Sequence, residues 1–288
     1  MKDGKGDEGG IMQERKLVGA DGYILEVQTL SKDFGALRAV HDVSFAVEQG
    51  HIFSIIGPNG AGKTTAFNLI TGVYAATAGK VLFQGRDILG LPQHEITELG
   101  IARTFQKLRL FRRMSVMDNV LVGMHCRTNS GVRDAFLGTP KLKQEERQSA
   151  MRALRLLKSV GIDEYWDSMA CELSYGDQRR LEVARALATE PKLLLLDEPT
   201  AGMNPAEKDD MMGLIQNIRD GGTTVLLVEH DMKVVMGISD GIVVLDHGEK
   251  ICEGTPSEVQ CDERVIEAYL GARYRRDPQA GSTPVVGP

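Results

Sequence analysis

A glycine-rich stretch of the chain has the residue types that bind phosphate groups. It lies between an apolar run at residues 53–56 and a helix-like segment at residues 66–70, so a buried strand, a tight turn and a helix N-terminus follow one another. The glycines allow successive backbone N–H groups to point inward, and the helix adds its positive dipole end at the same spot. The predicted phosphate-binding residues are Gly57, Pro58, Asn59, Gly60, Ala61, Gly62, Lys63, Thr64 and Thr65.

Two of these residues have side chains suited to a magnesium triphosphate. Lys63 is expected to reach the β- and γ-phosphates as a point charge. The Thr64 hydroxyl is expected to coordinate Mg²⁺, which prefers oxygen ligands and keeps several of its waters. The alternative, a chance glycine turn, is disfavoured because a strand precedes the turn and a helix follows it.

Two carboxylates follow directly on a run of leucines. Asp197 and Glu198 come after residues 193–196, whose continuous leucines predict a strand buried on both faces of a parallel sheet. The carboxyl ends of such strands border the crevice where open α/β sheets bind ligands. We expect Asp197 to hold Mg²⁺ through a water, and Glu198 to orient and deprotonate the water that attacks the γ-phosphate.

Polar residues also end two other predicted strands. His230 follows the apolar run at residues 224–228 and is assigned to the γ-phosphate, although a lone histidine is more often structural. Gln106 ends a predicted strand at residues 101–106 and is a candidate polar sensor. A glutamine at a strand end is usually only solvated, so the assignment of Gln106 depends on its context.

A helix with a polar N-terminus is predicted after Leu173. Ser174 is the expected N-cap, so its hydroxyl and the first free N–H groups form a tip that attracts anions. An ordinary capped helix is the alternative, but capping alone does not account for Gly176. The predicted apolar face comprises Leu181, Ala184, Leu187 and Ala188, and the predicted opposite face comprises Arg179, Arg180, Glu182 and Arg185.

The order of the predicted elements indicates an α/β fold. Alternating apolar residues between positions 23 and 47 predict a small antiparallel sheet ahead of the central strand, and the apolar period becomes helical between residues 107 and 190. We divide the chain into a flexible leader at 1–22, a folded domain at 23–271 with a helical subdomain at about 107–190, and a flexible tail at 272–288.

The composition of this 288-residue chain is typical of a globular protein. A hydrophobic content of 42% supports a core, and a net charge of −6 argues against an extended nucleic-acid surface. No apolar stretch approaches the roughly 20 residues needed to cross a bilayer, and no signal-peptide core is evident, so we expect a cytosolic protein. Without CxxC spacing, neither a zinc site nor a disulfide framework is indicated for Cys126, Cys171, Cys252 and Cys261.

A basic cluster near Gln106 has apolar residues among its charges. Because the protein is acidic overall, this cluster predicts a solvated face or a docking surface for a protein partner rather than a nucleic-acid site. The basic residues are Arg103, Lys107, Arg109, Arg112 and Arg113. The interleaved apolar residues are Leu108, Leu110, Phe111 and Met114.

In this order, the motifs resemble those of the nucleotide-binding subunits of ABC transporters over about residues 23–271. GPNGAGKT resembles Walker A, Gln106 the Q-loop, LSYGDQ the family signature, LLLLDEP Walker B with Glu198 as catalytic carboxylate, and His230 the switch histidine. The signature is the specific motif, because other ATPases with Walker motifs lack it. The resemblance implies a P-loop NTPase (RecA-like) core with an antiparallel β subdomain and an inserted α-helical subdomain. It also implies ATP and Mg²⁺ as ligands, the metal being held at Thr64, Gln106 and Asp197.

The resemblance changes the interpretation of Phe34. Taken alone, Phe34 is more readily a buried core residue. In ABC ATPases, however, an aromatic residue at this place stacks on adenine, which makes Phe34 a candidate nucleotide contact.

The signature region departs from the general family pattern. Tyr175 and Asp177 replace the usual Gly and Gln of LSGGQ, and Asn204 stands where most members have the Asp of the D-loop. Asp177 is expected to point away from the nucleotide. Ser174 and Gly176, which the resemblance assigns to the γ-phosphate, are kept.

Longer strings resemble the branched-chain amino-acid importer ATPases of bacteria and archaea. They are LSYGDQRRLEVARALAT, AGMNP, VEHDMKVVMGISD, and EGTPSEV with VIEAYLG. Relatives that serve urea and short amides, or that extract lipopolysaccharide, are the alternatives. A soluble ABC ATPase for DNA repair or translation, and a P-loop kinase or GTPase-like switch, are disfavoured, because no second cassette or coiled-coil insertion is present and a kinase or switch has no need of the signature.

The resemblance also implies partners. Two ATPase subunits pair head to tail, so that each ATP lies between Walker A of one and the signature of the other. The second subunit is either this chain or a shorter paralogue. Transmembrane permease subunits dock beside the Q-loop, and a substrate-binding protein acts indirectly, without nucleic acid. The expected location is the cytoplasmic face of the inner (plasma) membrane.

Overall fold

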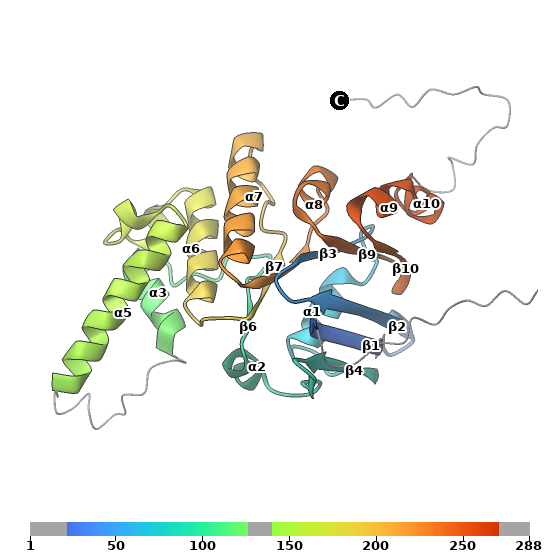
Figure 1. Cartoon of the computed structure of the whole chain (residues 1–288), viewed down its shortest axis with the longest axis horizontal. Helices are drawn as coiled ribbons and strands as arrows, with labels where there is room; N and C mark the ends of the chain where they lie inside the picture. The colour runs from blue at the N-terminus through green and yellow to red at the C-terminus, as the bar shows by residue number, and fades with distance from the viewer. Residues whose placement is uncertain (1–21, 126–139, 271–288) are drawn as a thin grey trace, which may run out of the picture.

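The computed structural model describes residues 22–125 and 140–270, which form two sheets and a separate group of helices (Figure 1). The predicted leader at 1–22, apart from Gly22, lies outside the described residues, as do Cys126 and the predicted tail at 272–288. No helix within the described ranges combines the length and hydrophobicity that a membrane-spanning segment requires.

The first sheet is antiparallel and has the strand order β2-β1-β4-β5. It comprises β1 (Tyr23–Phe34), β2 (Leu37–Glu48), β4 (Ala78–Phe83) and β5 (Arg86–Asp87). The alternating apolar residues of β1 and β2 turn one face inward, onto a core shared with the second sheet. The antiparallel sheet predicted from this alternation is therefore present.

The second sheet has the order β10-β9-β3-β8-β7-β6 and is parallel except for the β9–β10 hairpin. It comprises β3 (Ile52–Ile56), β6 (Ile101–Arg103), β7 (Leu193–Asp197), β8 (Thr224–Val228), β9 (Gly241–Asp246) and β10 (Glu249–Gly254). The strand predicted at residues 101–106 is wrong in its extent, because β6 ends at Arg103 and Gln106 lies in the loop beyond it.

Strand β7 is buried on both faces, as its leucines predict. Leu193 and Leu195 belong to the core shared with the antiparallel sheet. Leu194 and Leu196 point to the opposite face and join the core formed with the helices. All four side chains have an exposed fraction of 0%, so β7 is held in register from both sides.

Nine α-helices are present in the described ranges. They are α1 (Lys63–Ile70), α2 (Gln93–Leu99), α3 (Val116–Met124), α5 (Pro140–Ser159), α6 (Tyr175–Leu187), α7 (Pro205–Asp220), α8 (Met232–Ile238), α9 (Pro256–Cys261) and α10 (Glu263–Leu270). Two 3-10 turns, Asp163–Tyr165 and Ala170–Glu172, lie between α5 and α6.

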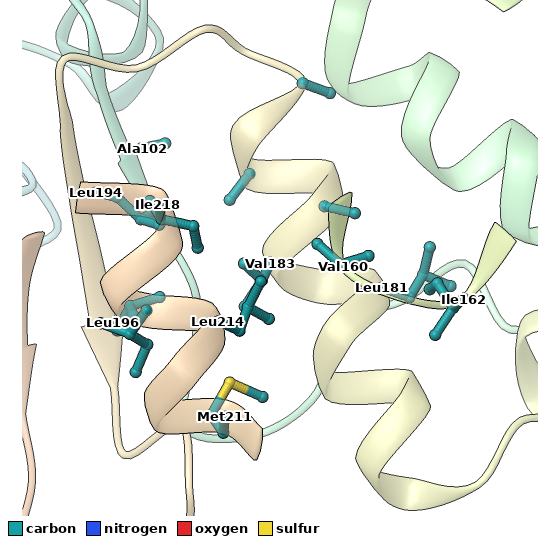
Figure 2. Close-up of a cluster of buried hydrophobic side chains, with 14 of the residues drawn as sticks. Ala102, Val160, Ile162, Leu181, Val183, Leu194, Leu196, Met211, Leu214 and Ile218 are labelled. Atoms are coloured by element: carbon teal, nitrogen blue, oxygen red, sulfur yellow. The ribbon is translucent and has the colours of Figure 1, made fainter. Parts of the chain in front are cut away.

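Helix α6 lies between the sheet layer and the outer helices. Figure 2 shows Val183 turned toward Leu214 of α7, and Leu181 turned toward Val160 and Ile162 on the other side. A helix covered on both sides has little room for a solvated face.

Two residues of the polar face predicted for α6 are nevertheless buried. Arg179 is 3% exposed and Glu182 is 2% exposed. Helical periodicity separates a polar face from an apolar one, but it does not tell whether another segment covers the polar face. Here the loop that follows β6 covers it.

Replacing Leu194 by alanine tests the buried register of β7. Leu194→Ala removes a fully buried side chain, so the free energy of unfolding should fall by about 2–5 kcal/mol. Leu154→Ala on α5 is the matched control, because Leu154 is 40% exposed and alanine favours a helix. Urea unfolding followed by circular dichroism measures both, and equal losses for the two variants would contradict the assigned register.

Candidate functional site

The glycine-rich turn joins β3 to α1 and passes close to neighbouring backbone. A Cβ on Gly57 would lie 2.0 Å from the carbonyl oxygen of Leu245. Gly62 has φ 97°, and a Cβ there would lie 2.5 Å from the carbonyl oxygen of Ala39. These two positions therefore require glycine for both conformation and space.

The N-terminus of α1 is open to an anion. Its N-cap, Gly62, has no side chain to cap the helix, and the first helical hydrogen bond is donated by Ala66 to the Gly62 carbonyl. The N–H groups of Lys63, Thr64 and Thr65 therefore have no acceptor within the helix. Together with the helix dipole they form a site suited to phosphate oxygens.

Lys63 lies over this turn. Its ammonium donates hydrogen bonds to the carbonyls of Gly57 (2.7 Å) and Pro58 (2.9 Å). Burial lowers the pKa of Lys63 from its ordinary value, and the nearby carboxylates of Glu198 and Asp197 oppose that shift. The cation is thus held beside both carboxylates by backbone oxygens.

A cleft of about 480 Å³ opens over the turn, a volume within the usual range for ligand sites. It brings together most of the predicted site residues, namely Phe34, Asn59, Gly60, Ala61, Gly62, Lys63, Thr64, Thr65, Gln106 and Glu198. Leu37, Arg38, Ala39 and His247 also line it, and sequence reasoning missed them. Of these, Arg38 had the clearest signal, because it is a cation only four residues after the candidate nucleotide contact Phe34.

Phe34 lies at the mouth of the cleft rather than in the core. Its exposed fraction is 43%, which excludes the buried-core alternative. The ring packs edge-on against Tyr74, with 5.4 Å between centroids, and the ammonium of Lys32 lies 4.9 Å from its centre. Because Phe34 lines the cleft and is partly exposed, its ring is a candidate for stacking on a planar ligand.

Glu198 is held in a strained backbone conformation just beyond β7. Its φ of 49° lies in the left-handed region, which non-glycine residues rarely adopt. Its N–H donates to the carbonyl of Val228 (2.9 Å), and its carboxylate accepts a hydrogen bond from the Gln106 amide (3.0 Å). His230 Nδ1 is 3.8 Å from the same carboxylate oxygen. Three polar residues predicted from separate strand ends therefore meet at one point.

Asp197 forms an ion pair with Arg103, which the sequence analysis placed in the basic cluster near Gln106. Arg103 donates a 2.8 Å hydrogen bond to the Asp197 carboxylate. It also donates to the side chains of Asn68 in α1 (2.6 Å) and of Thr71 at the end of α1 (3.0 Å). The Arg103 side chain is only 9% exposed, so its prediction as part of a docking surface is wrong. Burial raises the pKa of Asp197, and Arg103 opposes that shift.

Sequence reasoning also missed Glu229, which organises the loops around the carboxylates. Its side chain is fully buried and accepts hydrogen bonds from the N–H (3.0 Å) and hydroxyl of Thr200. Its second oxygen accepts the N–H of His230 (3.0 Å). The sequence signal for Glu229 was its position, because it is a carboxylate between the end of β8 and His230.

The signature residues lie outside this cleft. Ser174 caps α6, as predicted, by accepting the N–H of Asp177 (3.2 Å), and its hydroxyl donates to the Asp177 carboxylate (2.7 Å). Neither Ser174 nor Gly176 is among the described residues that line the cleft. Asn204, at the D-loop position, caps α7 in a capping box with Glu207.

The oxygen donors of the cleft fit a magnesium ion bound together with phosphates. Thr64 and Gln106 both line it, and Asp197 ends the adjacent strand, although its side chain is only 2% exposed and does not line the cleft itself. Within the described ranges, no three His, Cys, Asp or Glu side chains are grouped as metal ligands.

Two family models match the sequence. Residues 40–201 match the family described as ABC transporter. Residues 249–275 match the family described as branched-chain amino acid ATP-binding cassette transporter.

Similar curated proteins carry related descriptions. The chain is 46% identical to BraF, the high-affinity branched-chain amino acid transport ATP-binding protein of Pseudomonas aeruginosa, over 86% of this chain and 98% of that protein. It is 37% identical to LptB, the lipopolysaccharide export system ATP-binding protein of Escherichia coli, over 87% of this chain and 98% of that protein.

Solved structures share the fold. The ADP conformation of MJ1267, an ATP-binding cassette of an ABC transporter, matches with a TM-score of 0.75 and 32% identity over 86% of this chain and 99% of that chain. A dimeric post-hydrolysis state of the cassette MJ0796, bound to ADP and Pi, matches with a TM-score of 0.67 and 25% identity over 81% and 98%. The predicted fold class is confirmed, and the chain belongs to the ABC transporter family, as one of its ATP-binding cassettes.

Proposed function

We propose that this chain is the ATP-hydrolysing subunit of an importer for branched-chain amino acids. The observation that carries the proposal is that Lys63, Gln106 and Glu198 line one cleft, with the Gln106 amide 3.0 Å from the Glu198 carboxylate. The cargo is supported by the higher identity to BraF than to LptB, and by the match at residues 249–275. The cargo is not argued from the described contacts, because we assign the cleft to the nucleotide.

The predicted site residues have the following roles in this proposal. The N–H groups at the start of α1 and the Lys63 ammonium bind the β- and γ-phosphates, and the Phe34 ring stacks on adenine. Thr64, Gln106 and Asp197 hold Mg²⁺, which when bound neutralises charge on the phosphate oxygens. Binding of Mg²⁺ would give Asp197 a second cationic partner beside Arg103.

Glu198 is the general base. Its carboxylate accepts the proton of the attacking water, while the Gln106 amide and the strained backbone fix its direction. His230, with a half-exposed side chain 3.8 Å from Glu198, is within reach of the γ-phosphate side of the cleft. The geometry suits hydrolysis because the base is held before the substrate arrives.

The second half of the site comes from another subunit. Ser174 and Gly176 at the tip of α6 lie outside the cleft of their own chain, so they can contact a nucleotide only across a dimer. The ADP- and Pi-bound dimer of MJ0796 supports such pairing. The partner is a second copy of this chain or a homologous paralogue, and ATP favours the closed dimer by contacts that both subunits make.

The loop after Gln106 is the proposed docking surface for a transmembrane permease. Phe111 is 48% exposed there, and Lys107, Arg109, Arg112 and Arg113 are exposed around it. An exposed aromatic side chain with a basic rim suits a short helix of a membrane partner. This docking would hold the subunit at the cytoplasmic face of the membrane, with a substrate-binding protein acting through the permease.

Replacing Glu198 by glutamine tests the base. Glu198→Gln keeps the size of the side chain but removes its basicity, so turnover should fall by about 10²–10⁴-fold while MgATP binding is retained. Light scattering should then detect an ATP-dependent dimer. The control is Glu190→Gln, which breaks only an exposed pair with Arg152. Unimpaired hydrolysis in Glu198→Gln would remove Glu198 from its role.

Replacing Lys63 by alanine tests the phosphate site. Lys63→Ala removes a charge-assisted donor to two phosphate groups, so MgATP affinity should fall by about 100-fold or more in titration calorimetry. Lys192→Ala is the control, because the Lys192 ammonium bonds the exposed Gln84 side chain (2.7 Å) and does not line the cleft. Tight MgATP binding by Lys63→Ala would contradict the assignment of the cleft.

The cargo requires the intact transporter. The full-length chain should co-purify with permease subunits, and the ATPase rate of the reconstituted complex should rise with leucine and its binding protein. Urea and a neutral short amide are the comparisons. Stimulation by urea but not by leucine would reassign the cargo and leave the ATPase proposal in place.

A further inference from the structure

Arg179 of α6 has an acceptor for every N–H group of its guanidinium. Nη1 donates to the Phe105 carbonyl (2.8 Å) and to Glu182 (3.1 Å), and Nη2 donates to the Gln106 carbonyl and to the Tyr175 hydroxyl (3.1 Å). Nε donates to the same hydroxyl (3.3 Å). Because arginine has five N–H donors in a fixed fork, this arrangement fits only one position of the loop at residues 105–106.

Glu182, one turn further along α6, holds the same loop from its N–H side. Its carboxylate accepts the N–H groups of Phe105 and Arg109, each at 3.4 Å. Glu182 and Arg179 are both nearly fully buried, and each is the charge partner of the other. Carbonyl and N–H groups of one loop are therefore bound by one buried ion pair on the signature helix.

Tyr175 links this pair to the start of the signature helix. It stands where the general family pattern has glycine, and its hydroxyl accepts two of the five Arg179 N–H groups. Its ring lies against the loop after β7, since a Cβ on Gly202 would be 3.5 Å from the ring. A glycine at position 175 offers no such acceptor.

We propose that Tyr175, Arg179 and Glu182 are positioning residues for hydrolysis, which fix the backbone at Gln106 so that its amide meets Glu198. The inference rests on the proposed ATPase function and deepens it. It makes the tip of α6, which faces the second subunit, and the Gln106–Glu198 contact parts of one rigid connection. A displacement of helix α6 on dimer closure would then be transmitted to Gln106 through the Arg179 guanidinium and its hydrogen bonds to the loop.

Two conservative variants test the connection in the full-length chain. Arg179→Lys keeps the charge but has three donors in place of five, so kcat should fall about 10-fold or more with KM for ATP within about 2-fold. Tyr175→Phe removes only the hydroxyl, and kcat should fall about 3-fold. The double variant should be no slower than Arg179→Lys alone, because both changes break one network.

Matched controls lie on nearby elements. Arg180→Lys changes the neighbouring arginine, which bonds Val160 and Asp210 instead of the loop. Tyr165→Phe removes a hydroxyl from the exposed 3-10 turn. Both controls should keep the wild-type kcat. Calorimetry of MgATP binding and thermal unfolding should show values for Tyr175→Phe equal to those of the wild type, which separates positioning from a loss of fold.

The outcomes separate this inference from the function on which it rests. Wild-type kcat in folded Tyr175→Phe and Arg179→Lys, with turnover still lost in Glu198→Gln, would overturn the connection alone. Additive losses in the double variant would overturn it as well. Turnover that persists in Glu198→Gln would instead refute the proposed base. If Arg179→Lys does not fold, the Tyr175→Phe variant alone tests the inference. A lower kcat with an unchanged KM for ATP would support it, and an unchanged kcat would contradict it.

Discussion

The burial of β7 on both faces is the constraint on which the rest of the structure depends. Leu193 and Leu195 pack into one core, and Leu194 and Leu196 into the other. A slip by one residue would exchange these two sets and leave neither core filled. Because β7 cannot slide, the carboxylates that follow it have a fixed height at the sheet edge, near the turn that leaves β3.

Two carboxylates, Asp197 and Glu198, lie at that edge of the sheet, and the cations of Arg103 and Lys63 lie close to them. Arg103 pairs with Asp197, and Lys63 lies beside both carboxylates. Asp197 has both a charge partner and a hydrogen bond from Arg103, and Lys63 is hydrogen-bonded to two carbonyls, which are conditions under which buried charges are tolerated. The pairs contribute order more than stability, since they fix the direction of each carboxylate before any ligand is bound.

In the proposed assembly, a single chain supplies only one side of the phosphate site. The turn after β3 is proposed to bind phosphate through N–H groups at the uncapped start of α1, whereas the start of α6 is capped by Ser174 and lies outside that cleft. The Arg179–Glu182 pair reaches from the start of α6 back to Gln106. The start of α6 and the loop at Gln106 are therefore connected by hydrogen bonds, although only Gln106 lines the cleft. Such a connection suits a protein in which nucleotide contact causes movement.

The sequence by itself determined the features that depend on residues close together in the chain. The glycine turn, the buried leucine strand with its carboxylates, the Ser174 cap and the antiparallel sheet follow from local pattern, which predicts an α/β fold. The detailed fold class and the roles of Phe34 and Gln106 were predicted from the family resemblance. The tertiary structure alone decided the pairings over long separations. Arg103 meets Asp197 from 94 residues away, and Arg179 meets Phe105 from 74. Periodicity assigns a residue to a face of its helix or strand, but only packing decides which other segment covers that face. For this reason the buried charges of α6 and the true place of Arg103 could not be predicted from sequence.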